Sequence, residues 1–360
     1  MRNLLNSLNL PCLLEDRTGR SLSTLEEWES RRKELKELLQ REEYGYFPPP
    51  VPFEVSRKEI RKGEFSGFTT WERLNFHVSN AVKCVNIPVN LLYPENTAGQ
   101  IPFILFINFR PDIPDRYLYV EDIIEKGFGV ATFCYSDVSS DSADWDGLCD
   151  FFCAEEQKTQ TTFGKIGIWS YMAQRVMDYL QTLDFVDKKN IAVMGHSRLG
   201  KCALLTAAFD ERFAFACVNN SGCCGASISR GKGGETIADI TERFGYWFCG
   251  NLKKYSHNEI SMPFDQHFLL ALVAPRKVCI GTAELDTWAD TDYQLLNCIA
   301  ADEIYKLYGS TGYIGEYVPC NPETYYTDGD LAFFNRTGTH FMSIRDWRVY
   351  MDYILTHKNG

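Results

Sequence analysis

The chain has 360 residues and a mass of 41.3 kDa, which suits one large α/β domain or two small domains. Hydrophobic residues make up 45% and charged residues 24% of it, a composition that excludes a disordered or fibrous protein. The net charge of −11 argues against a nucleic-acid binder, which would present a basic face, and no apolar run approaches the ~18 residues of a membrane span.

The N-terminus and the cysteines bear on the cellular compartment. Asn3, Asn6 and Asn9 interrupt the apolar residues of the N-terminus, which makes a poor signal-peptide core. The thirteen cysteines include no Cys-x-x-Cys pair, so no zinc site is predicted. We expect free, buried thiols and a cytoplasmic location. The alternative is a secreted or periplasmic protein whose signal has been removed and which carries one or two disulfides.

Residues 1–52 are predicted to form a helical extension that packs on the main domain. Thr24 and Glu27 have the spacing of a capping box at a helix start. Prolines at 48–50 and 52 then end the helix and form a bridge to the main domain. One face of the helix is expected to be apolar, through Leu25, Trp28, Leu35, Leu38 and Leu39.

Residues 53–360 are predicted to form the main domain. Two long strands, near 65–78 and 82–93, should pair antiparallel, and short apolar strands then alternate with helices. This alternation indicates a mostly parallel sheet covered on both faces. An insertion at about 225–270 should lie over the top edge of the sheet, where such loops shape ligand sites. The remaining predicted strands are 101–108, 129–135, 191–196, 213–219 and 277–281, and the predicted helices are 118–126, 166–183, 199–209 and 290–308.

The most informative segment is the run GHSRLGK at 195–201. A predicted strand enters a serine flanked by glycines, and a helix of small residues comes directly after it, which is the pattern of a nucleophile elbow. The tight turn would lift the Ser197 hydroxyl above the sheet, and the helix N-terminus would direct N–H groups at an oxyanion. Gly195 and Gly200 would relieve crowding against the neighbouring backbone. The alternative is an ordinary strand-to-helix turn capped by a serine.

Partners for the serine occur in the chain order of an α/β-hydrolase, first the acid and then the histidine. Asp286 lies just beyond the strand at 277–281, and His340 comes after a short strand and before the final helix. Glu284 and Asp290 compete with Asp286, although Asp290 is better placed to cap the next helix. Glu235 is a more distant alternative. His340 alone among the six histidines has the loop position that a mobile base needs.

From about residue 20 onward, the sequence resembles the glucuronoyl esterases of carbohydrate esterase family fifteen and related bacterial polysaccharide esterases. The run at 195–201 has the family's form Gly-x-Ser-Arg-x-Gly-Lys, and an arginine directly after the serine is unusual among α/β-hydrolases. The bacterial branch is matched by NNSGCCG at 219–225, by Trp247-Phe248, and by PFDQH and APR within 263–276. The resemblance implies an α/β-hydrolase fold, a mostly parallel three-layer sandwich with N-terminal antiparallel strands, in which 53–360 is the catalytic domain.

The resemblance also implies roles for individual residues. Ser197 would be the nucleophile and His340 the base. Arg198 would aim its guanidinium and backbone N–H at the oxyanion, Lys201 would reach the hydroxyls of a sugar acid, and Trp288 would wall the sugar site. Each of these last three has a structural alternative: Arg198 could cap or pair at the sheet edge, Lys201 could be a solvated helix residue, and Trp288 could pack in the core.

The chain departs from the family at three places. Fungal members have a disulfide-bonded cysteine before the serine, where this chain has His196, expected to be a buried packing group. Many members carry a catalytic glutamate after the sixth strand, where Asn220 stands, so the acid is predicted to be Asp286. The family's sugar-contacting Gln and Glu are not evident, because Thr236 and Phe244 fall there, which leaves the exact substrate open.

The sequence therefore predicts a serine esterase in which Asp286 fixes the imidazole tautomer of His340, with no metal or organic cofactor. The favoured substrate is a (4-O-methyl)glucuronoyl ester that joins glucuronoxylan to lignin alcohols in plant cell walls. One alternative is an acetyl xylan esterase that removes O-acetyl groups, and another is a catalytically silent scaffold that binds carbohydrate. No nucleic-acid or membrane partner is expected, and the oligomeric state cannot be deduced from the sequence.

Overall fold

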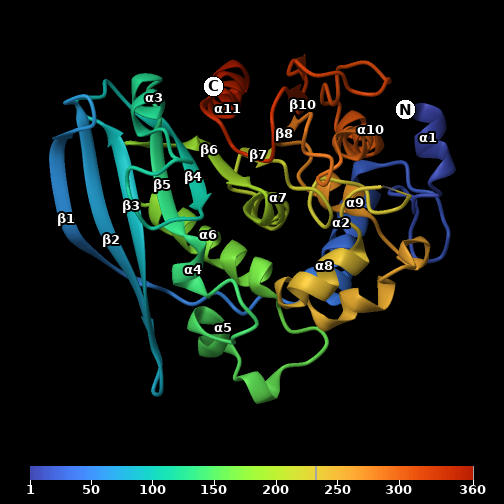
Figure 1. Ribbon diagram of the computed structural model, residues 1–360, viewed down its shortest axis with the longest axis horizontal. Helices are drawn as coiled ribbons and strands as arrows, with labels where there is room; N and C mark the ends of the chain where they lie inside the picture. The colour runs from blue at the N-terminus through green and yellow to red at the C-terminus, as the bar shows by residue number, and fades with distance from the viewer. Residues whose placement is uncertain (232, 360) are drawn as a thin grey trace.

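The computed structural model describes residues 1–231 and 233–359. In these residues, ten strands form one sheet in the order β1-β2-β3-β5-β4-β6-β7-β8-β10-β9 (Figure 1). The six strands from β5 to β10 in this order are parallel, whereas β1, β2 and β3 run antiparallel at one edge and β9 at the other. The strands are β1 Glu54–Glu64, β2 Thr69–Ser79, β3 Cys84–Pro94, β4 Ile101–Asn108, β5 Gly129–Cys134, β6 Val186–His196, β7 Phe215–Asn219, β8 Lys277–Ala283, β9 Thr324–Tyr326 and β10 Leu331–Arg336.

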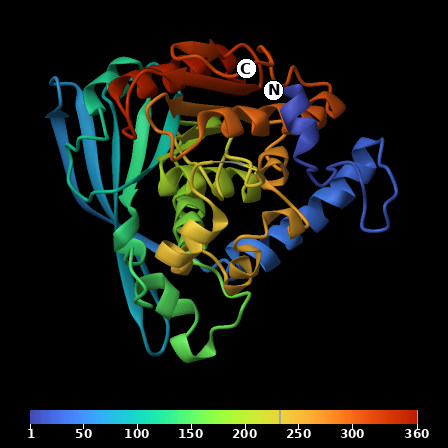
Figure 2. The ribbon, with the colours of Figure 1, turned by 45° about the vertical axis from the view of Figure 1, so that its right-hand side comes forward.

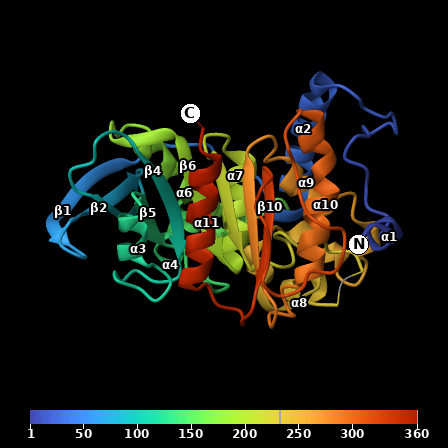
Figure 3. The same ribbon diagram turned by 90° about the horizontal axis from the view of Figure 1, so that it is seen from above.

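Helices cover both faces of the sheet and complete a three-layer sandwich. Helices α3 and α11 lie on one face, and α6, α7 and α10 pack on the other (Figures 1 and 3). Each face has its own buried apolar cluster, so the sheet is the wall between two parts of the core. The α-helices are α1 Arg2–Ser7, α2 Leu25–Leu39, α3 Val120–Glu125, α4 Tyr135–Val138, α5 Gly147–Phe152, α6 Lys165–Leu180, α7 Arg198–Phe209, α8 Ile237–Phe244, α9 Gln266–Ala271, α10 Thr291–Leu307 and α11 Ile344–His357.

The mostly parallel sheet and its alternating helices confirm the fold class read from the sequence. Two strands were not predicted. The edge strand β1 is largely exposed and rich in Lys, Arg and Glu, so it carries no apolar alternation to detect. Strand β9 has only three residues. Among the described residues, no helix is long and apolar enough to cross a lipid bilayer.

The N-terminal extension shares the core of the main domain. Helix α2 begins at the expected cap, with Thr24 Oγ1 accepting from the Glu27 N–H at 3.2 Å. Trp28 and Leu35 are fully buried in the apolar cluster on the α6–α7 face, whereas Leu25 is exposed, contrary to the prediction. Arg32 donates a hydrogen bond to the Leu272 carbonyl at 2.9 Å and ties the helix to the chain after α9.

The insertion after β7 consists of short helices that lie beside α2 (Figures 1 and 2). Besides α8 and α9, it contains the 3₁₀ segments η3 Gly245–Trp247, η4 Gly250–Tyr255 and η5 Glu259–Ser261. At the end of α8, Phe244 stacks on Trp247 with ring centroids 4.1 Å apart. Both rings contact the guanidinium of Arg198 at the start of α7, so the insertion reaches the predicted elbow.

Candidate active site

The turn between β6 and α7 has the geometry of a nucleophile elbow. Ser197 adopts φ 58° and ψ −128°, a strained conformation that surrounding contacts must hold. Its N–H donates to the Asn219 carbonyl at 2.8 Å, which pins the turn to the neighbouring strand β7. A Cβ on Gly195 would lie 2.0 Å from the Leu199 carbonyl oxygen, and one on Gly200 would lie 2.9 Å from that of Asn219. The predicted need for two glycines is confirmed.

Three side chains from neighbouring strand ends meet above this turn. His340, in the loop between β10 and α11, has Nε2 2.8 Å from Ser197 Oγ and Nδ1 2.6 Å from Asp286 Oδ2. Strands β6, β8 and β10 are parallel, so the loops that follow their carboxyl ends lie at the same end of the sheet. The structure thus brings together the three residues that the sequence predicted as a triad.

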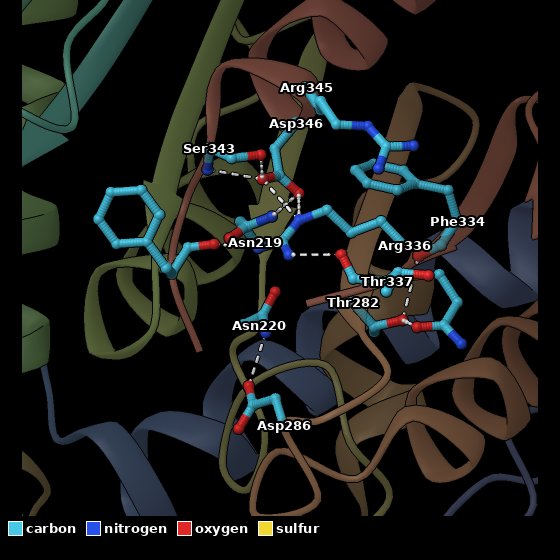
Figure 4. A network of polar contacts seen from close by, with 12 residues as sticks. Asn219, Asn220, Thr282, Asp286, Phe334, Arg336, Thr337, Ser343, Arg345 and Asp346 are labelled. Atoms are coloured by element: carbon cyan, nitrogen blue, oxygen red, sulfur yellow. Dashed lines mark hydrogen bonds and ion pairs between the residues drawn. The ribbon is translucent and has the colours of Figure 1, made fainter. Parts of the chain in front are cut away.

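The acid of this constellation is held in its charged form. Burial would raise the pKa of Asp286, but hydrogen bonds from His340 and Asn220 and the charge of the imidazole outweigh it and lower the pKa. Asn220 donates its amide to Asp286 Oδ2 at 2.6 Å (Figure 4). The two competing acids lie elsewhere: Glu284 is exposed, and Asp290 accepts from the Tyr293 N–H as the cap of α10.

His196 is the buried packing group that the sequence predicted. Its ring lies against that of His340, with centroids 4.7 Å apart, and its Nδ1 is 2.7 Å from Asn219 Oδ1. Burial, aided by the nearby imidazole of His340, lowers the pKa of His196 to about 3. It therefore stays neutral beside the exposed His340 ring.

Arg198 lies between an acid and a set of aromatic rings. Its Nη1 donates to Asp141, and at 3.4 Å to the Tyr135 hydroxyl, while Trp247 lies 4.9 Å below the guanidinium. Asp141 also accepts from the Trp247 indole at 2.7 Å, so one carboxylate fixes both the cation and its aromatic platform. The Arg198 Nε is buried and has no partner in the described part of the chain.

Lys201, Glu235 and Trp288 form a second polar group beside the elbow. Lys201 is buried, which excludes a solvated helix position, and it donates to Glu235 Oε2 at 3.0 Å and to the carbonyls of Ser221 and Cys223. Its three N–H donors are thus already occupied. Trp288 is 43% exposed, which excludes core packing, and its indole donates to Glu235 Oε1 at 3.2 Å.

Glu235 has partners that the sequence does not predict. From the sequence it is only a distant alternative for the triad acid, and Thr236 and Phe244 fall where the family has its sugar-contacting Gln and Glu. In the structure Thr236 is the N-cap of α8, and Phe244 stacks on Trp247. The nearby Glu235 links Lys201 to Trp288 instead. No sequence signal identifies these contacts. Glu235 lies 34 positions from Lys201 and 53 positions from Trp288, and no spacing rule connects residues that far apart.

All thirteen cysteines are free thiols in the structure; nine are buried, whereas Cys12 and Cys84 are exposed. Cys223 and Cys224, adjacent in the turn after β7, have their sulfurs 3.9 Å apart. No group of three or more His, Cys, Asp or Glu side chains capable of holding a metal ion occurs among residues 1–231 and 233–359.

A serine on a strained strand-to-helix turn, with acid and histidine on later loops of a parallel sheet, defines the α/β-hydrolase class. The family described as fungal glucuronyl esterase matches residues 76–309, more than half of the chain. The chain belongs to the glucuronoyl esterase family.

Individual relatives agree with this assignment. A carbohydrate esterase of an unknown prokaryotic organism is 36% identical over 244 residues, 67% of this chain and 56% of that protein. The 4-O-methyl-glucuronoyl methylesterase of Podospora anserina is 27% identical over 287 residues, 76% of this chain and 55% of that protein. The chain thus spans about half the length of these curated relatives. A CE15 glucuronoyl esterase from Teredinibacter turnerae superposes with a TM-score of 0.90 at 26% identity, covering 98% of this chain and 90% of that structure.

Proposed function

We propose that the protein is a serine carboxylic ester hydrolase whose substrate is a (4-O-methyl)glucuronoyl ester of glucuronoxylan, esterified to a lignin alcohol. The observation that carries this proposal is the continuous hydrogen-bond chain from Asp286 through His340 to Ser197. Family membership and the names of the relatives, which include 4-O-methyl-glucuronoyl methylesterases, support the choice of ester.

In the acylation step, Ser197 Oγ attacks the ester carbonyl carbon while His340 Nε2 takes the hydroxyl proton. Asp286 holds the Nδ1–H of His340 and stabilises the imidazolium that forms. When the tetrahedral intermediate collapses, the bond to the alcohol oxygen breaks and His340 gives its proton to that oxygen. The alcohol leaves, and the uronoyl group stays on Ser197 as an ester.

In the deacylation step, His340 takes a proton from a water molecule that attacks the same carbonyl carbon. Collapse of this second intermediate returns the proton to Ser197 Oγ and releases the uronic acid. General base assistance of this kind contributes about 10²- to 10⁴-fold in rate. Each turn of the cycle consumes one ester and one water and restores the enzyme.

The oxyanion of both intermediates is assigned to Arg198. Its backbone N–H occupies the first position of α7, where no intrahelical carbonyl is available to accept it. The side chain adds a buried Nε that has no partner among the described residues. Removing one such donor typically costs about 3 to 4 kcal/mol of transition-state stabilisation. Asp141 and Trp247 hold the guanidinium in place.

The sugar portion is assigned to the group formed by Lys201, Glu235 and Trp288. The half-exposed Trp288 ring offers a flat apolar surface for the C–H face of a pyranose, and the Glu235 carboxylate can accept from sugar hydroxyls. Lys201 already donates to three oxygens, so we assign it to holding Glu235 and the 221–223 turn rather than to free contact with the sugar.

A substrate panel tests the proposal. Purified protein is given the methyl ester of 4-O-methylglucuronic acid, a benzyl glucuronate ester and acetylated xylan, with the Ser197→Ala variant as the matched control. We expect uronate release that Ser197→Ala abolishes. Acetate release without uronate release would replace the proposal with an acetyl esterase. Absence of any Ser197-dependent hydrolysis, together with no labelling by a fluorophosphonate, would leave only a carbohydrate-binding scaffold.

A further inference from the structure

A buried arginine forms hydrogen bonds with the backbone of the loop that carries His340. Arg336 ends β10, is 4% exposed, and turns its guanidinium under residues 337–341. It donates to the carbonyl oxygens of Thr337 at 3.3 Å, of Thr339 at 3.4 Å, and of Phe341. These carbonyls lie on both sides of His340. A single side chain therefore restrains the backbone that leads into and out of the imidazole.

Asp346 connects this arginine to the far end of the same loop. Both of its carboxylate oxygens lie 2.8 Å from Arg336 Nε, and it also accepts from the N–H and hydroxyl of Ser343 at 2.7 Å each (Figure 4). Ser343 caps α11. The loop from β10 to α11 is thus anchored at both ends on one fully buried carboxylate.

The network continues from Asp346 to the histidine that packs on His340. Asn219 donates its amide to Asp346 at 3.1 Å and to the Tyr350 hydroxyl at 3.2 Å, so its Oδ1 is the atom that faces His196 Nδ1. An amide oxygen accepts, which places the proton of neutral His196 on Nδ1. The ring beside His340 is therefore an uncharged wall with a defined tautomer.

We propose that the Arg336–Asp346 pair is the positioning device of His340: it fixes the 337–343 loop directly and, through Asn219, the neutral ring of His196 against which His340 packs. The inference rests on the proposed function, because His340 must act as a base for its position to matter. A merely structural pair would affect unfolding alone. A positioning pair affects turnover at temperatures where the protein stays folded, since displacing a reacting group by about 1 Å costs about 10²-fold in rate.

The experiment compares Arg336→Met and Arg336→Lys with a matched control, Arg276→Met. Arg276 is also a largely buried arginine that donates to backbone carbonyls, those of Ala207, Asp210, Phe213 and Leu272, but it precedes β8 and so lies at the amino ends of the parallel strands, away from His340. For each variant, kcat and KM are measured on the methyl ester of 4-O-methylglucuronic acid, with the rate of Ser197 labelling by a fluorophosphonate and the Tm. Ser343→Ala, which removes one donor to Asp346, is added in case Arg336→Met does not fold.

We expect Arg336→Met to lower kcat and the labelling rate about 10- to 100-fold while KM stays within about twofold of the wild-type value. Arg336→Lys and Ser343→Ala should lower kcat and the labelling rate less. Arg276→Met should lower only the Tm. Unchanged kcat and labelling in Arg336→Met, or in Ser343→Ala where Arg336→Met does not fold, would overturn the inference, as would equal losses in Arg276→Met at equal Tm. If the wild-type protein hydrolyses no ester, the proposed function fails, while the labelling rates still decide whether Arg336 sets the reactivity of Ser197.

Discussion

The most direct test of the triad moves its negative charge from position 286 to position 220. Asp286 Oδ2 lies 2.6 Å from both His340 Nδ1 and Asn220 Nδ2. In Asp286→Asn, the new amide can donate one hydrogen to Asn220 Oδ1, which has no partner in the described structure, once the Asn220 amide flips. The other hydrogen then goes to His340 Nδ1. His340 would carry its proton on Nε2, facing Ser197, and could not accept another.

The size of the effect is set by this tautomer change. Inverting the tautomer of the base costs about 10⁴-fold in kcat, or about 5.4 kcal/mol at about 1.36 kcal/mol per tenfold. Asn220→Glu, introduced together with Asp286→Asn, places a carboxylate one methylene further from the backbone than the Asn220 amide. This carboxylate would lie close to the position that Asp286 Oδ2 occupies in the wild-type protein. With a misplacement of about 1 Å costing about 10²-fold, the double variant should recover about two of the four orders.

Steady-state kcat on the methyl ester of 4-O-methylglucuronic acid is measured for both variants, beside the double variant Asn220→Gln/Asp286→Asn as a control of equal length without charge. Position 220 has φ 46°, so a side chain other than Asn costs about 1 to 2 kcal/mol there, and Tm must be measured in parallel. The reasoning is refuted if Asp286→Asn keeps kcat within about tenfold of wild type. It is also refuted if the glutamate restores no more activity than the glutamine at equal Tm.

Two further changes probe other parts of the site and the core. Arg198→Ala should lower kcat about 10- to 1000-fold, because it removes the guanidinium of the residue that directly follows Ser197, whose Nε has no partner among the described residues, and kcat equal to wild type would remove the oxyanion role. Burial, opposed by hydrogen bonds with Cys224 and Gln266, raises the pKa of Glu43 to about 8. The folded state then keeps a proton that the unfolded chain releases near pH 4.5, so the unfolding free energy falls by up to about 1.4 kcal/mol per pH unit between about pH 5 and pH 8. Glu43→Gln should flatten that decline in a series of thermal melts, and parallel curves would contradict it.

The triad was accessible from the sequence because its chemistry is arranged by strand order. In a parallel sheet, the residues that follow the carboxyl ends of the strands all lie at the same end of the sheet. Ser197, Asp286 and His340 each come after a recognisable apolar strand, so their convergence needs no knowledge of side-chain packing. The elbow glycines were accessible for a similar reason, since the crowding they relieve is local to the turn.

The supporting residues were not accessible, because their partners are distant and of ordinary type. Asp141 reaches Arg198 across 57 positions, from an irregular loop that contains several serines and aspartates. Asn219 meets Asp346 across 127 positions, and both look like routine cap or turn residues in the sequence. The role of each of these residues depends on which distant residue it contacts, and those contacts are set by the tertiary structure. Strand β1 was missed for a different reason, because its largely exposed, charged sequence shows no apolar alternation.

The arrangement of charge explains why Asp286 should dominate the chemistry. Three cationic side chains described above each have a carboxylate of their own: Arg198 has Asp141, Lys201 has Glu235 and Arg336 has Asp346. Each pair is close to neutral from the distance of the imidazole, and His196 adds no charge because its pKa is about 3. The positive charge that forms on His340 during turnover is therefore stabilised chiefly by Asp286, whose Oδ2 lies 2.6 Å from His340 Nδ1.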